Sequence, residues 1–250
     1  MVNIMIEHDS YIEFKRLLDE NIINLFSKNN YDFSINNDFL EKEYEKLEKI
    51  IGYKFKCIKY SRQTHSTNIR VITEDNLGET LEDIDGIITN VPGVALVTMV
   101  ADCQGILIYD KKKKVIGNVH SGWRGTLNKI IKNAVETMIE NFDSNTKDLI
   151  VCICPSILEC CFEVDEEVAL EFKNNFEDID EFIKLGKIKE GKQKYYIDTV
   201  GINKKVLINL GVKEDNIICS NICTKCNSDK YHSYRANKLC GRNIALICMK

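Results

Sequence analysis

Apolar and polar residues alternate along the chain in patterns that predict helices and strands mixed from end to end. Helical spacing of apolar residues predicts one helix at 38–51, with Gly52 as its stop signal. An apolar stripe at 127–139 predicts a second helix, and two more are expected at 165–174 and 198–210. Short apolar runs, largely β-branched, predict strands at 56–60, 68–73, 86–90, 94–101, 105–109, 115–119, 149–154 and 243–249.

The order of these elements indicates the fold class. The run 94–101 is apolar on both alternating faces apart from Thr98, so we expect a fully buried strand there. The basic stretch 110–114 lies between two strands and is expected to be a solvated hairpin turn. Helices do not alternate with every strand, and no linker or repeat divides the chain. We therefore expect one α/β domain over residues 1–250, with β-sheet layers flanked by helices and a mixed strand order.

Composition narrows the class of protein further. The 250 residues are 44% hydrophobic and 29% charged, which is ordinary for a globular chain with a real core. A net charge of −4 argues against a nucleic-acid partner. The first residues lack the apolar segment of an export signal, and the apolar run 94–101 is too short to span a bilayer. We expect a cytoplasmic protein with no membrane partner, and the oligomeric state stays open.

Cysteine is abundant, with eleven residues, but the number is odd and no export signal precedes them. We therefore expect reduced thiols. Cys223 and Cys226 form a C-x-x-C motif, which leaves open a structural zinc site, a redox pair or simple packing. The adjacent pair 160–161 is expected to pack. A zinc site would need two more thiols, for which the candidates considered are Cys219 and Cys240.

Three other residues are candidate metal ligands. Cys103 and His120 each come directly after a predicted buried strand, and His65 lies in a polar turn between strands. Two imidazoles and a thiolate can hold zinc tetrahedrally with one position open, which is the catalytic pattern. Copper is the alternative, although such sites use a weak axial ligand and Met99, the nearest methionine, is expected to face the core. Spacing alone leaves open whether the three residues meet.

Short motifs around these residues resemble a known family. In chain order they are Gln63-Thr64-His65, Asp85-Gly86-Ile87-Ile88-Thr89, Ala101-Asp102-Cys103 and His120-Ser121-Gly122-Trp123-Arg124-Gly125, followed by shorter matches at 160–164, 197–198, 203, 223–226, 233–235 and 241–242. From about residue 55 onward the chain resembles the laccase-domain, or polyphenol oxidase-like, family described as purine nucleoside phosphorylases. The resemblance implies a single α/β domain of β-sheet layers flanked by helices.

The resemblance also implies an activity and a site. It implies a metal held by the residues matching His65, Cys103 and His120. It implies phosphorolysis of adenosine, inosine, guanosine or methylthioadenosine, together with adenosine deamination. The expected partners are accordingly a purine nucleoside and phosphate.

Further residues receive roles in this hypothesis. We expect phosphate near the helix N-terminus after Gly122, with Arg124 or Arg62 supplying positive charge. Asp102 is a candidate proton shuttle, or alternatively a group that orients a ligand. The remaining candidates for contact with the substrate are Gln63 and Arg235.

The N-terminal part, residues 1–54, diverges from the family pattern. Asn29 and Asn30 stand where the family has glycines, and Glu43-Tyr44 stands where an Asn-Arg pair is usual. Two rival functions stay open beside the nucleoside enzyme. One is a peptidoglycan editing factor or a copper-dependent phenol oxidase. The other is a degenerate, non-enzymatic module that binds a nucleoside or a partner.

Overall fold

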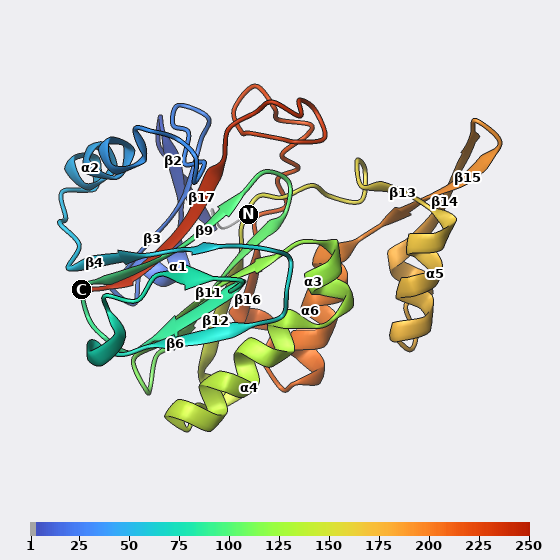
Figure 1. The fold of residues 1–250 in the computed structure, drawn as a ribbon. Coiled ribbons are helices and arrows are strands. Elements are labelled where there is room, and N and C mark those ends of the chain that lie inside the picture. The colour runs from blue at the N-terminus through green and yellow to red at the C-terminus, as the bar shows by residue number, and fades with distance from the viewer. Residues whose placement is uncertain (1–3) are drawn as a thin grey trace.

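Two six-stranded sheets packed face to face form the centre of the computed structural model, which describes residues 4–250 (Figure 1). In spatial order, the first sheet contains β1 (Met5–Glu7), β2 (Tyr11–Phe14), β3 (Ile22–Ser27), β17 (Asn243–Met249), β9 (Val94–Val100) and β4 (Cys57–Lys59). The second contains β16 (Ile217–Cys219), β12 (Leu149–Ile153), β10 (Gln104–Asp110), β11 (Val115–Ser121), β8 (Gly86–Thr89) and β6 (Ile69–Ile72). Parallel and antiparallel pairs occur in both sheets.

Within residues 4–250, two smaller sheets and six α-helices complete the fold. A three-stranded sheet has the order β13 (Glu163–Asp165), β15 (Lys192–Ile197) and β14 (Ile183–Lys189), and a short pair joins β5 (Ser61–Arg62) to β7 (Leu81–Glu82). The helices are α1 (Lys15–Leu18), α2 (Leu40–Ile51), α3 (Trp123–Leu127), α4 (Ile130–Phe142), α5 (Glu166–Asn175) and α6 (Thr199–Asn209). No helix within residues 4–250 combines the length and the apolar character needed to cross a membrane.

Helices cover the outer face of each large sheet. Helix α2 lies on the first sheet and buries Leu40, Tyr44 and Leu47 against it, whereas α4 and α6 lie on the second (Figure 1). The expected α/β class, with sheet layers flanked by helices and a mixed strand order, is therefore confirmed. The hairpin β14–β15 and helix α5 extend to one side of these layers (Figure 1).

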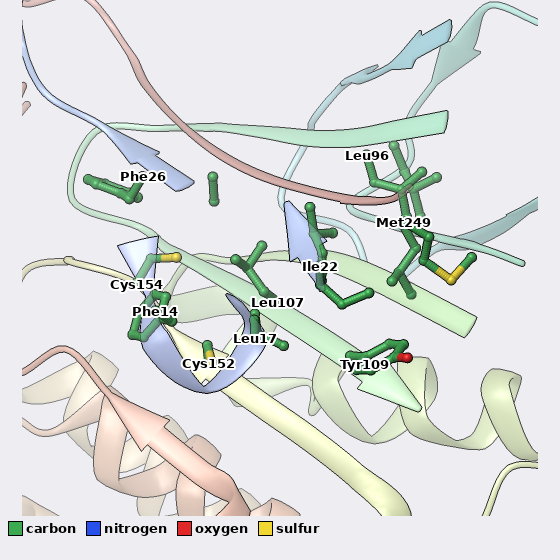
Figure 2. Close-up of a cluster of buried hydrophobic side chains, with 14 of the residues drawn as sticks. Phe14, Leu17, Ile22, Phe26, Leu96, Leu107, Tyr109, Cys152, Cys154 and Met249 are labelled. Carbon is green, nitrogen blue, oxygen red and sulfur yellow. The ribbon is translucent and has the colours of Figure 1, made fainter. Parts of the chain in front are cut away.

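The space between the two sheets is filled by apolar side chains from both. Figure 2 shows Leu96 and Met249 of the first sheet with Leu107, Tyr109 and Cys152 of the second. These side chains are at most 5% exposed. Burial on this scale supplies most of the stabilisation of a layered fold.

One polar side chain also joins the two sheets. Asn118 of β11 donates from Nδ2 to the carbonyl oxygens of Leu96 (2.9 Å) and Ala245 (2.8 Å) in the first sheet. Its Oδ1 accepts from the Thr98 hydroxyl at 2.9 Å. Because all these groups are buried, the bonds fix how the sheets lie relative to one another.

Each predicted element is present in the structure, but one helix is divided and several short elements were not predicted. The predicted helix at 127–139 is split into α3 and α4, because Lys129 adopts a left-handed backbone with φ of 58°. The elements before residue 28 were not predicted, and neither were β5, β7, β13, β14, β15 and β16. The turn at 110–114 is confirmed, since β10 and β11 pair as an antiparallel hairpin across it.

The close approach of the sheets at Gly105 yields a test. A Cβ added there would lie 2.4 Å from the Cβ of Ala245 in the facing sheet. We expect Gly105→Ala to lower the free energy of unfolding by about 1–3 kcal/mol. Gly117→Ala is the matched control, because its Cβ would meet no atom closer than 3.5 Å. Adding Ala245→Gly to Gly105→Ala should restore part of the lost free energy of unfolding, measured by denaturant titration. Effects of the two substitutions that simply add would contradict the contact.

Candidate metal centre

The structure brings His65, Cys103 and His120 together. One ring nitrogen from each histidine and the thiol sulfur all lie within 4.8 Å of one another. The Sγ of Cys103 is 3.6 Å from Nε2 of His65, and the two imidazole rings meet edge to face at 4.8 Å between centroids. His120 is buried within β11, whereas His65 is exposed in the loop after β5 and Cys103 lies between β9 and β10. Three separate segments of the chain therefore converge on one point.

A buried carboxylate holds two of these segments in place. Asp85 has a fully buried side chain, and its Oδ1 accepts hydrogen bonds from Nδ1 of His120 at 2.7 Å and from the backbone N–H of His65 at 3.1 Å. Its Oδ2 accepts from the backbone N–H groups of Thr64 and Ser66 and from the Ser66 hydroxyl. One side chain thus fixes the loop that carries His65 and the orientation of the His120 ring.

These contacts shift the protonation of the cluster. Burial alone would raise the pKa of Asp85, but the hydrogen bonds from His120 and Ser66 outweigh it and lower the pKa to about 2. Burial would likewise raise the pKa of Cys103, but the charge and hydrogen bonds of His120 and His65 lower it to about 6. Burial would lower the pKa of His120, but the charges and hydrogen bonds of Cys103 and Asp85 outweigh it and raise the pKa to about 9. The protein therefore favours a thiolate at Cys103, which is the form that binds metals.

Backbone geometry supports the convergence of the three side chains. His65 and Asp102 both adopt left-handed conformations, with φ of 64° and 85°, in the tight loops that turn the ligands inward. Gly122 closes the other side of the cluster. A Cβ at residue 122 would lie 2.5 Å from Cδ2 of His65 and 3.1 Å from Sγ of Cys103, so glycine leaves the space that the cluster occupies.

The donor set and its surroundings fit a divalent metal. Asp85 accepts a hydrogen bond from Nδ1 of His120, so Nε2 is the ring nitrogen left for a metal. A carboxylate that holds a histidine ligand in this way is common in zinc sites. Two imidazoles and one thiolate leave one tetrahedral position for water or substrate.

The cluster lies on the wall of a cleft of about 760 Å³. Its other lining residues come from several segments, including Ser34, Ile35, Asn36, Arg62, Gln63, Met99, Trp123, Tyr234, Lys238 and Arg242. Met99 packs against a core cluster, as expected, and it is also partly exposed where it lines this cleft. The divergent N-terminal part contributes Ser34 to Asn36, whereas Glu43 lies on α2 and does not line the cleft.

The other sequence-predicted candidates occupy different positions around the cluster. Gln63 lines the cleft, but its amide is bound to the backbone N–H and carbonyl of Met99 at 2.8 and 2.9 Å. Arg62 lines the cleft with an exposed side chain. Arg124 is exposed, and its guanidinium lies 4.2 Å over the ring of Trp123.

Asp102 is buried behind the cluster and its carboxylate is already bonded. Its Oδ1 accepts from the Thr224 hydroxyl at 2.7 Å and its Oδ2 from the backbone N–H of Arg235 at 2.6 Å. Together with Gly122 and Arg235 it lines a smaller hollow of about 140 Å³ on the other side of Cys103. This geometry favours a positioning role over a proton shuttle.

Two residues with evident positioning roles carried no role in the sequence analysis. Asp85 and Thr224 both lie within the motifs noted there, but neither motif indicates which side chain the residue contacts. A signal for Asp85 was present, since this acidic residue directly precedes the predicted strand at 86–90 and its apolar pair Ile87-Ile88. Such a residue needs buried partners if it is to stay charged.

Comparison with known proteins agrees with this fold. Residues 24–250 match the family described as multi-copper polyphenol oxidoreductase laccase. A Clostridium acetobutylicum protein named purine nucleoside phosphorylase is 34% identical over 248 residues, which span 96% of each chain. A protein named adenosine deaminase, from an unknown prokaryotic organism, is 32% identical over 182 residues, or 70% of this chain and 68% of the relative. The crystal structure of YlmD from Geobacillus stearothermophilus superposes with a TM-score of 0.88 at 20% identity, covering 99% of each chain.

The fold and site define a layered α/β protein with a His–Cys–His cluster at the edge of a cleft. The chain belongs to the multi-copper polyphenol oxidoreductase laccase family. The names of its relatives support an enzyme role.

Asp85 provides the test of this architecture. The amide nitrogen of asparagine cannot accept hydrogen bonds, so Asp85→Asn leaves unpaired the buried donors that now bond to one of the two carboxylate oxygens. We expect a loss of about 3 kcal/mol or more in the free energy of unfolding, and faster amide exchange at residues 64–66. The matched control is Asp83→Asn, since Asp83 contacts the same loop from its exposed side. Equal effects of the two substitutions would contradict the role assigned to Asp85.

Proposed function

We propose that this protein is a metal-dependent enzyme that cleaves purine nucleosides with phosphate and also deaminates adenosine. The observation that carries the proposal is the convergence of His65, Cys103 and His120 at the wall of a cleft large enough for a nucleoside. Relatives named purine nucleoside phosphorylase and adenosine deaminase support the same substrate class.

In this proposal the metal is zinc, held by His65, Cys103 and His120. When bound, zinc would supply Lewis-acid chemistry, polarising a substrate oxygen or lowering the pKa of water. Asp85 keeps the His120 ring oriented, and Asp102 keeps the loop before Cys103 in place. Gln63 fixes the start of the His65 loop to β9 through the backbone of Met99. These residues position the ligands and leave the open face of the cluster to the cleft.

The remaining cleft residues suit the two parts of the substrate. Trp123 and Tyr234 offer aromatic surface against which a purine can stack. Arg62, Lys238 and Arg242 also line the cleft and supply positive charge for phosphate. The split of the predicted helix leaves α3 only five residues long, so its dipole contributes less to phosphate binding than we expected. We therefore favour Arg62 over Arg124 as the phosphate contact.

A second candidate is copper-dependent oxidation of phenols. The presence of Met99 at the cleft favours it, because a thioether is the usual weak axial ligand of a His₂Cys copper site. Copper-loaded protein that shows visible absorption and consumes oxygen with a phenol would support this candidate over the nucleoside enzyme.

The variant Cys103→Ala tests the proposed function. We expect it to lose one equivalent of metal per chain and to lower nucleoside turnover about 100-fold or more, because the metal loses its thiolate ligand. Metal analysis would measure the metal content of each protein. Product chromatography would follow adenine and ribose 1-phosphate in the presence of phosphate, and inosine in its absence. Cys57→Ala is the control, since Cys57 lies in β4 outside the cleft. If the unaltered protein binds metal but turns over no nucleoside, the result would contradict the catalytic claim and indicate a binding module.

The phosphate site has its own test. We expect Arg62→Ala to raise the KM for phosphate about tenfold or more, the magnitude of one lost charge-assisted hydrogen bond, while leaving deamination of adenosine unchanged. Arg70→Ala is the control, because Arg70 is paired with Glu79 away from the cleft. Initial-rate kinetics would measure both reactions. A raised KM in Arg124→Ala but not in Arg62→Ala would transfer the role to Arg124.

A further inference from the structure

A second group of thiols lies outside the cleft. Cys160 and Cys161 are in the loop between β12 and β13, and Cys223 and Cys226 are in the turn that follows β16. Their four sulfur atoms all lie within 4.8 Å of one another. Cys219 and Cys240, the partners considered for the C-x-x-C motif, do not belong to this group. The fold instead supplies the pair at 160–161, far away in the sequence.

The spacing of the sulfur atoms is that of a tetrahedral metal site. Sγ of Cys226 lies 3.4 Å from Sγ of Cys161 and 3.8 Å from Sγ of Cys160. Zinc–sulfur bonds of about 2.3 Å place the corners of a tetrahedron roughly 3.8 Å apart.

We propose that Cys160, Cys161, Cys223 and Cys226 form a structural zinc site distinct from the His–Cys–His cluster. Four protein thiolates fill the coordination of zinc and leave no open position, so this site would not act on substrate. Cys160 and Cys226 are exposed, so the metal can enter from solvent.

The position of the site indicates what it stabilises. Thr224, between the two cysteines of the motif, donates its hydroxyl to Asp102, and the Arg235 guanidinium donates to the carbonyl oxygens of Cys161 and Glu163. The backbone N–H of Arg235 also donates to Asp102. The zinc would therefore join the turn that carries Thr224 to the loop that anchors the Arg235 guanidinium. Thr224 and Arg235 are the two residues that hold the carboxylate of Asp102, the residue directly before Cys103.

Zinc content and coordination of the full-length chain test this proposal without reference to activity. The Cys103→Ala variant, prepared under reducing conditions with zinc, should keep one zinc per chain. X-ray absorption at the zinc edge should then show sulfur ligands alone at about 2.3 Å. Adding Cys223→Ser and Cys226→Ser to Cys103→Ala should remove that zinc, whereas adding Cys219→Ala should not.

Several outcomes would overturn the proposal. These are a Cys103→Ala protein without zinc, nitrogen or oxygen ligands around its remaining zinc, and iron in place of zinc. A Cys161–Cys226 disulfide in freshly reduced protein would also overturn it. The absorption measurement needs no substitution among the four cysteines, so misfolding of the triple variant would not affect its result. Failure of the nucleoside activity would leave this site intact, since neither measurement depends on turnover.

Discussion

The buried carboxylate of Asp85 is the constraint on which the site depends. Asp85 directly precedes β8, and β8 pairs with β11 so that Gly86 lies opposite Val119. This register places the Asp85 side chain beside His120, the next residue of β11, at 2.7 Å. The same carboxylate holds the backbone of the loop that carries His65. A single charged group, kept ionised by its hydrogen bonds, thus transfers the rigidity of the sheet to a loop.

The two-sheet architecture explains why the cleft forms at this edge. Asn118 joins the two sheets by hydrogen bonds, and Gly105 allows them to approach closely. The end of β9, the start of β10 and the end of β11 therefore lie side by side. Asp102 turns the chain sharply between β9 and β10, which directs Cys103 toward the histidines. A buried network from Asn203 of α6 to Gln104, Ser121 and Thr126 fixes the opposite side of the same edge. The candidate metal centre is therefore preformed by groups that are not among its three candidate ligands.

Local pattern predicted the central strands and most helices because their burial is regular. It failed for β3, where Asn24 and Ser27 interrupt the apolar run. Both are buried, since Asn24 accepts the backbone N–H of Phe14 and Ser27 that of Ile244. The candidate ligands His65, Cys103 and His120 could be named from residue type and position. Their convergence, the contacts of Asp85 and the grouping of Cys160 and Cys161 with the C-x-x-C motif depend on long-range packing that local spacing does not encode.

The central claim is that a metal at the His65–Cys103–His120 centre is required for turnover of purine nucleosides. The most direct measurement is the rate of adenosine consumption by chelator-stripped, unaltered protein during stepwise return of zinc. The account predicts negligible activity in the stripped protein. It also predicts a rise in proportion to occupancy of this centre, with a plateau when the centre is filled. Full turnover by metal-free protein would contradict it.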